Sequence, residues 1–231
     1  VTGNMASGLH FSGIANITGQ SFGGLMASGL LNVVGEHMNG LQIAGIANIT
    51  ASKLNGVQVA LCNYATKARG LQIGLVNYYK EDMKGFQLGL VNANPDTKVQ
   101  MMVYGGNATP ANIGVRFKNQ LYTILGVGSM YQGLNDKFSA SASYRAGLSF
   151  PLYKGLSISG DLGYQHIEAF DNKDEVIPKR LYALQARANL EYQFTRKFGI
   201  FATGGYGLTR FYNKSSNYDK GAIIEAGIVL F

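Results

Sequence analysis

A repeat of about sixteen residues runs through the first 95 residues and restricts their fold more than any other feature of the chain. Glycines recur at intervals of 16, 16, 16, 14 and 15 residues, and an asparagine closes each segment. The repeated positions are Gly8, Gly24, Gly40, Gly56, Gly70 and Gly85, with Asn16, Asn32, Asn48, Asn63, Asn77 and Asn92. Each copy is therefore expected to form the same unit of structure.

Side chains alternate within each copy as they do in a β-strand. In the copy that begins at Gly70, Leu71, Ile73 and Leu75 alternate with Gln72, Gly74 and Val76. Successive side chains of a strand point to opposite faces, so one face of this segment is aliphatic. Polar stretches such as 51–55 and 80–84 separate the segments. Each segment is long enough for a tilted strand to cross a membrane, which takes about 9–11 residues.

Two architectures fit such a repeat. Each copy is either one strand and one turn of an up-and-down barrel, or one coil of a β-solenoid in which equal side chains form ladders. A solenoid must show its outer face to water, yet residues 1–50 contain a single charged residue, Glu36. The low charge favours the barrel, and the solenoid remains the alternative.

The remainder of the chain, residues 96–231, alternates over longer segments. In 181–195 an apolar face that begins at Tyr182 and ends at Phe194 opposes a polar face that includes Arg187 and Glu191. Apolar faces bracketed by aromatic residues are typical of membrane barrels. We expect eight strands here, at 98–105, 111–118, 121–132, 138–150, 155–168, 181–195, 198–212 and 219–231.

Together with six strands from residues 1–95, these segments predict an all-β fold: one antiparallel, fourteen-stranded transmembrane barrel over residues 1–231. The alternative is an N-terminal β-solenoid followed by an eight-stranded barrel. Short and long connections alternate along the second half, as periplasmic turns and extracellular loops do. This alternation predicts that both termini are periplasmic.

Composition agrees with a membrane barrel. Charged residues make up 14% of the chain, well below the quarter or so found in soluble domains. No run of about 18 apolar residues occurs, so a transmembrane helix is not expected.

The run GLQIGLVNYYKEDMKGFQLGLVN, at residues 70–92, resembles the tandem surface repeats of outer-membrane proteins found in Bacteroidetes and spirochaetes. The resemblance covers residues 8–95. It implies a location in the outer membrane and no particular reaction.

Charged side chains lie on the strand faces that the alternation assigns to the barrel lumen. A charge inside a narrow barrel must be paired or hydrated. We interpret the set as a salt-bridged network that closes the lumen, and a charged constriction that selects small solutes is the alternative. The set comprises Arg116, Arg145, Asp161, Arg187, Glu191 and Glu225.

Catalytic and metal-binding residues are not expected. Of the three histidines, only His166 can be grouped with a possible nucleophile, Ser159, and a carboxylate, Glu168, on the same expected strand. His166 shares its strand face with Tyr164, which places it outside the barrel and away from Ser159. Cys62 is the single cysteine, and no Cys/His cluster has metal-ligand spacing. We predict no enzyme activity and no cofactor.

The formal net charge of +7 does not indicate nucleic-acid binding, because the lysines and arginines are scattered through turns and strand ends. The expected partners are the lipid bilayer, lipopolysaccharide and other outer-membrane proteins. The sequence favours a structural or accessory subunit of an outer-membrane assembly, with a passive or solute-selective, porin-like channel as the alternative.

Overall fold

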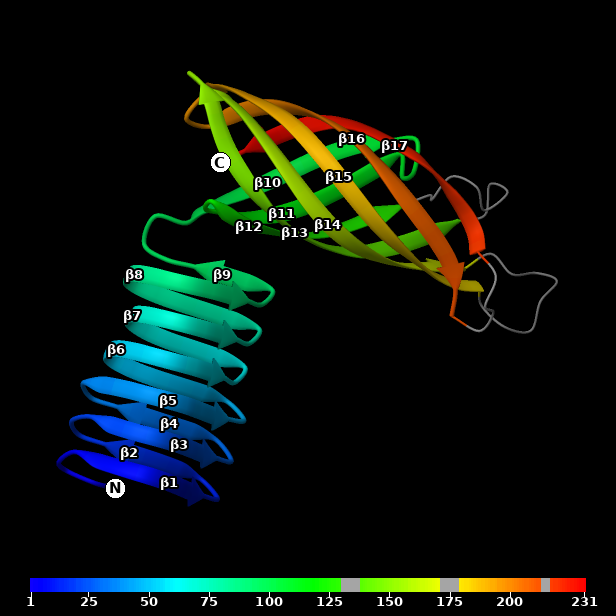
Figure 1. Ribbon diagram of the computed structural model, residues 1–231. Coiled ribbons are helices and arrows are strands. Elements are labelled where there is room, and N and C mark those ends of the chain that lie inside the picture. The colour runs from blue at the N-terminus through cyan, green and yellow to red at the C-terminus, as the bar shows by residue number, and fades with distance from the viewer. Residues whose placement is uncertain (130–137, 171–178, 213–216) are drawn as a thin grey trace. The chain divides into compact units, whose positions relative to one another are not determined.

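The computed structural model describes residues 1–129, 138–170, 179–212 and 217–231. The chain divides into two compact units, Val1–Thr97 and Lys98–Phe231, and both are built from strands (Figure 1). In the described part of the chain, no helix is long and apolar enough to cross a membrane.

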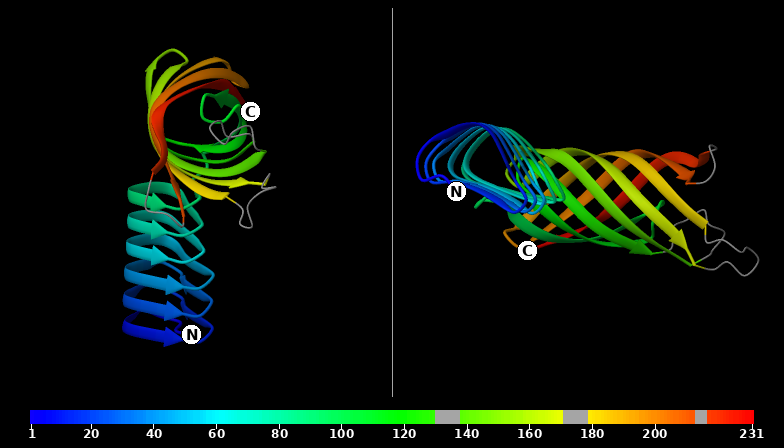
Figure 2. Two further views of the ribbon diagram at one scale, coloured as in Figure 1. Left: turned by 90° about the vertical axis from the view of Figure 1, so that its right-hand side faces the viewer. Right: turned by 90° about the horizontal axis from the view of Figure 1, so that it is seen from below.

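The first unit is a β-solenoid. Every strand pairs in parallel with the equivalent strand of the next repeat, so that Leu25 lies opposite Leu41 and Asn48 lies opposite Asn63. Figure 2 (right) looks down the stack of coils. The strands are β1 (Ala6–Ser12), β2 (Ala15–Thr18), β3 (Phe22–Ser28), β4 (Leu31–Val34), β5 (His37–Ala44), β6 (Ala47–Val59), β7 (Cys62–Ile73), β8 (Val76–Leu88) and β9 (Val91–Ala93).

The expected fourteen-stranded barrel is therefore wrong, and the solenoid followed by an eight-stranded barrel is the arrangement found. Residues 1–231 do not form one barrel domain, because residues 1–95 supply none of its strands. The alternation was recognised correctly, with its aliphatic face outward and its polar face inward, but the strands pair in parallel with the next coil and do not form an antiparallel barrel wall. Gln42 and Asn48 are fully buried inside the coil, whereas Ile43 and Ile46 are exposed outside it. The low charge of residues 1–50 thus reflects the apolar outer surface of a solenoid. It does not indicate a barrel wall.

The solenoid interior holds an apolar cluster around Met26, Met38 and Leu54, and the polar side chains buried beside it bond to one another in ladders. Each repeat asparagine donates from Nδ2 to Oδ1 of the next, over 2.9–3.1 Å along the whole series from Asn16 to Asn92. Gln58, Gln72 and Gln87 form a second ladder in the opposite direction, each donating from Nε2 to Oε1 of the preceding glutamine over 2.8 Å. Because buried amides are costly without partners, stacking identical residues at identical positions makes a polar interior possible.

Replacing Asn48 with alanine is expected to lower the free energy of unfolding of the solenoid by about 1–3 kcal/mol, the usual cost of breaking buried hydrogen bonds. Asn48 Nδ2 is placed to donate to Gln42 O at 3.2 Å, Val59 O at 3.0 Å and Asn63 Oδ1 at 3.1 Å. Thermal unfolding followed by circular dichroism measures the loss. The matched control is Asn55→Ala, which breaks a solvent-exposed contact to Asn39 and should change little. Equal effects of the two substitutions would contradict a stabilising role for burial of the ladder.

The second unit is a closed antiparallel barrel of eight strands. Each strand pairs with its neighbour in the sequence, and β10 pairs with β17 to close the ring (Figure 2, left). The eight strands expected from the sequence are confirmed, with bounds that differ by a few residues. They are β10 (Lys98–Gly106), β11 (Ala111–Lys118), β12 (Leu121–Ser129), β13 (Ser139–Tyr153), β14 (Leu156–Ala169), β15 (Lys179–Thr195), β16 (Phe198–Phe211) and β17 (Asn217–Leu230).

The two ends of the barrel differ in their connections. At one end lie two-residue turns at 119–120, 154–155 and 196–197, together with the start of β10 and the end of β17. At the other end the connections are longer, and the first of them is the segment 107–110. We call these the short-turn end and the long-loop end.

The outside of the barrel is an apolar belt between two groups of aromatic residues. Val103, Leu162, Leu184 and Ile224 are among the aliphatic side chains of the belt, and all are more than 40% exposed. Exposed aromatic residues near the short-turn end are Tyr153, Tyr192, Phe194 and Phe198, and those toward the long-loop end are Phe138, Tyr164, Phe170, Tyr206 and Tyr212. The barrel thus has the architecture and the outer surface of a transmembrane β-barrel.

Candidate functional site: the barrel lumen

The lumen holds all six charged residues that the sequence placed there. Each is at most 7% exposed, and each lies on an inward-facing position of its strand. Three of the residues are cationic and three are anionic, so their formal charges cancel. The cations are Arg116, Arg145 and Arg187, and the anions are Asp161, Glu191 and Glu225.

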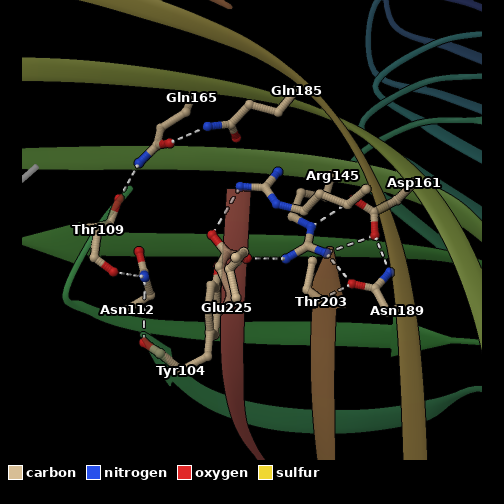
Figure 3. A network of polar contacts seen from close by, with 12 residues as sticks. Tyr104, Thr109, Asn112, Arg145, Asp161, Gln165, Gln185, Asn189, Thr203 and Glu225 are labelled. Carbon is tan, nitrogen blue, oxygen red and sulfur yellow. Dashed lines mark hydrogen bonds and ion pairs between the residues drawn. The ribbon is translucent and has the colours of Figure 1, made fainter. Parts of the chain in front are cut away.

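Arg145 is at the centre of the network (Figure 3). Its guanidinium donates from Nε to Asp161 Oδ1 over 2.8 Å and from Nη2 to Asp161 Oδ2 over 2.7 Å. Nη2 also donates to Asn189 Oδ1 over 3.0 Å, and Nη1 lies 3.7 Å from Glu225 Oε2. The guanidinium carbon is 5.9 Å from the centre of the Tyr104 ring. One cation is thus fixed by strands from around the barrel wall.

The neighbouring groups bond three of the four oxygens of the two central carboxylates, and Glu225 Oε2 is buried without a hydrogen-bond partner among the described residues. Asp161 Oδ2 also accepts hydrogen bonds from the Tyr122 hydroxyl and from Asn189 Nδ2, both over 2.8 Å. Glu225 Oε1 accepts a bond from Arg187 Nη2 over 3.2 Å. A buried carboxylate that pairs with a guanidinium and accepts further bonds recovers much of its lost hydration.

A second ion-pair cluster lies toward the short-turn end. Arg116 donates to both oxygens of Glu191, over 2.6 and 3.1 Å, and its Nε donates to Gln100 over 2.7 Å. Lys118 Nζ is 2.9 Å from Glu191 Oε1. This bidentate geometry fixes the orientation of both side chains.

The long-loop end of the lumen is filled by amides and apolar side chains. Gln165 Nε2 is placed to donate to Thr109 Oγ1 over 3.3 Å and to Ser141 Oγ over 2.8 Å, and Gln185 donates to Gln165 over 3.1 Å. Thr109 belongs to the connection 107–110 and is only 2% exposed, so this loop folds into the barrel. Beside it, Ala108 packs against a buried cluster composed of Ile167, Ala169, Leu181 and Ala183.

Sequence reasoning missed several members of the network, among them Tyr122, Asn189, Lys118 and Thr109. Tyr122, Asn189 and Lys118 occupy inward positions of their strands, so the same alternation that identified the charges would have identified them. Thr109 lies in a connection without periodic pattern, and only the structure shows that it enters the lumen.

The candidate catalytic set does not assemble. Ser159 is buried in the lumen, where its hydroxyl accepts a bond from Asn189 over 3.2 Å. His166 is on the outer face, and its ring contacts Glu168 at 3.6 Å and the Tyr212 hydroxyl at 2.9 Å. The barrel wall therefore separates nucleophile from base. Among the described residues, no group of histidine, cysteine and acidic side chains could hold a metal ion.

The lumenal groups bind to one another and leave few free for a solute. The six charged residues expected from the sequence are paired, Lys118 shares Glu191 with Arg116, and apolar and amide side chains occupy the long-loop end. This arrangement joins strands from around the barrel wall through ion pairs and hydrogen bonds.

Comparisons with known proteins relate to the barrel. No protein-family model and no curated protein matches the chain. Solved structures that resemble it include the N-terminal β-barrel domain of Pseudomonas aeruginosa OprF, with 19% identity over 57% of this chain and 93% of that chain and a TM-score of 0.38. Neisserial surface protein A has 12% identity over 57% and 92%, with a TM-score of 0.40. The Yersinia pestis outer membrane protein Ail has 18% identity over 58% and 99%, with a TM-score of 0.35.

Proposed function

We propose that the barrel spans a bacterial outer membrane as a closed anchor, and that the chain is a structural or accessory subunit of an outer-membrane assembly. The apolar belt with its aromatic borders supports the membrane location, because such a surface is costly in water and favourable in lipid. The ion-paired lumenal charges, and the separation of Ser159 from His166 by the barrel wall, support a role that is not enzymatic.

The observation that carries this proposal is the filled lumen. An eight-stranded barrel has an interior just wide enough for its own side chains. Here Arg145, Asp161 and Glu225 occupy its middle, Arg116 and Glu191 lie toward one end, and Thr109 closes the other. A solute would have to break buried ion pairs to pass.

The connections support an orientation. Outer-membrane barrels have short periplasmic turns and longer extracellular loops. The short-turn end also holds the start of β10 and the end of β17, so both ends of the barrel chain are proposed to be periplasmic. The solenoid then enters the barrel sequence from the periplasmic side, where it offers a stack of coils for contact with other components of the assembly.

The purified chain is expected to give no steady ionic conductance in planar bilayers, because the lumen is blocked along its length. A known porin in the same lipid provides the positive control, and protection of the barrel from protease confirms insertion. Steady, ohmic current steps from the inserted chain would refute the closed anchor and favour the solute-selective channel.

Native electrophoresis of outer membranes extracted in mild detergent tests the accessory role. The chain is expected in a complex much larger than its own 24.8 kDa plus bound detergent. Migration as an isolated monomer under conditions that preserve other membrane complexes would contradict membership of an assembly.

A further inference from the structure

One edge of the solenoid is an exposed row of aliphatic side chains. At the sharp corner of every coil, a leucine or isoleucine projects outward directly after a glycine or, in one coil, an alanine. Six coils contribute one such residue each, with exposed fractions between 39% and 70%. The corner row comprises Ile14, Leu30, Ile46, Leu61, Leu75 and Leu90.

The rows on both sides of the corner row are also apolar. On one side lie Ile43, Ile73 and Leu88, which are 37–57% exposed, and on the other lies Val76, which is 40% exposed. These rows contain alanine, valine, leucine, isoleucine, one phenylalanine, Phe11, and one cysteine, Cys62. We call the corner row and its two flanking rows the apolar edge. The flanking rows comprise Phe11, Ala27, Ile43, Val59, Ile73 and Leu88, and Ala15, Leu31, Ala47, Cys62, Val76 and Val91.

The opposite edge of the coils is polar. Lys67 lies there and forms an ion pair with Glu81, with both side chains about half exposed, and Lys53 and Asp82 occupy equivalent positions in the neighbouring coils. The solenoid is therefore amphipathic across its section, as an amphipathic helix is across its axis. Six coils at the usual strand spacing of about 4.8 Å make the apolar edge about 24 Å long.

An exposed apolar surface of this extent marks an interaction site. We propose that the apolar edge lies against the lipid of the membrane that the barrel spans. This inference rests on the proposed membrane location of the barrel. It gives the solenoid the role of a membrane-surface element in the same molecule.

The connection between the two units favours lipid as the occupant. Only residues 94–97 separate β9 from β10, and an extended chain of four residues reaches about 14 Å. A surface tethered so closely to an inserted barrel meets lipid at a high effective concentration, whatever the angle between the two units.

The chemistry of the edge also favours lipid over a protein. Protein interfaces rely on tyrosine, tryptophan and arginine anchors with hydrogen bonds around them. The three rows contain none of these anchors and no polar side chain other than the thiol of Cys62. Apolar contact without directional bonds is what the acyl-chain boundary of a membrane provides.

Cys62 gives a direct test, because this single cysteine is exposed and belongs to the apolar edge. The full chain, labelled there with an environment-sensitive fluorophore, is reconstituted in vesicles of phosphatidylethanolamine and phosphatidylglycerol that contain nitroxide-bearing acyl chains. Matched controls carry the label at Lys67→Cys on the polar edge, or at Leu184→Cys on the barrel belt, each in a Cys62→Ala background. We expect the nitroxides to quench the labels at 62 and 184 and to leave the label at 67 bright.

Each outcome decides between explanations. Quenching at 184 but not at 62 would overturn the lipid contact and leave the membrane barrel intact, whereas no quenching at either position would overturn both proposals. A label at 62 that is shielded from water but not quenched, and that becomes exposed with one chain per nanodisc, would assign the edge to a second copy. The double substitution Leu61→Glu and Leu75→Glu should abolish quenching of the label at position 62, whereas the control Lys67→Glu should not.

Discussion

Replacing Arg145 with methionine is expected to lower the free energy of unfolding of the barrel by about 3–5 kcal/mol, because breaking a buried ion pair leaves uncompensated charge inside. Arg145 donates both bonds that Asp161 receives from a cation, and it lies 3.7 Å from Glu225. Methionine fills similar volume without charge, so Asp161 would lose its ion-pair partner and Glu225 would keep only Arg187. Urea unfolding from lipid vesicles measures the loss.

A second substitution separates lost charge balance from lost packing. Adding Asp161→Asn to Arg145→Met restores neutrality in the lumen and keeps an acceptor for the Tyr122 hydroxyl. The double variant should therefore recover much of the stability that the single variant loses. If the double variant is as unstable as the sum of the two single variants, the two residues do not act as a pair.

Arg180 provides the matched control on the outside. It donates from Nε to Glu168 over 3.0 Å, but its side chain is 61% exposed. Exposed ion pairs contribute little to stability, so Arg180→Met should leave the unfolding curve nearly unchanged. Similar destabilisation by Arg145→Met and Arg180→Met would show that the lumenal network is not what stabilises the barrel.

The barrel half was predictable because its periodicity has one interpretation. Long alternating segments such as 181–195, with aromatic residues at both ends, fit a membrane strand and little else. The alternation also gave the lumenal side of Arg145 and Asp161, since a strand fixes the direction of each side chain. Thr109 could not be predicted, because no local pattern makes a loop residue enter a barrel.

The repeat half was misassigned because antiparallel strands and parallel coils share the same alternation. The information that distinguishes them is the constancy of the repeat. Antiparallel strands tolerate different lengths, whereas stacked coils must return to the same position after each turn. An asparagine at six equivalent positions from Asn16 to Asn92 also satisfies a ladder between coils, and the same residue inside a barrel would have no equal neighbour to bond.

The glycine at the start of each repeat also indicates stacked coils. A substitution at Gly56 tests whether close backbone contact between coils requires glycine there. The φ of Gly56 is +142°, in a region that residues with a side chain adopt only at a cost of about 1–3 kcal/mol. A Cβ at this position would lie 1.9 Å from the carbonyl oxygen of Gly40 in the preceding coil. Gly56→Ala must therefore strain the backbone and push two coils apart, and we expect this single methyl group to open the solenoid between Gly40 and Gly56.

Limited proteolysis of the chain in vesicles measures this opening. Cleavage within residues 1–97 should become much faster in Gly56→Ala, while the inserted barrel stays protected. Gly23→Ala is the matched control, because its added Cβ meets only the Ser7 Cβ at 4.0 Å, so its cleavage should resemble that of the unaltered chain. Equal protection of Gly56→Ala would mean that adjacent coils can separate at this point without cost. Close backbone contact at the glycines would then not hold the coils in register, and the side-chain ladders alone would have to do so.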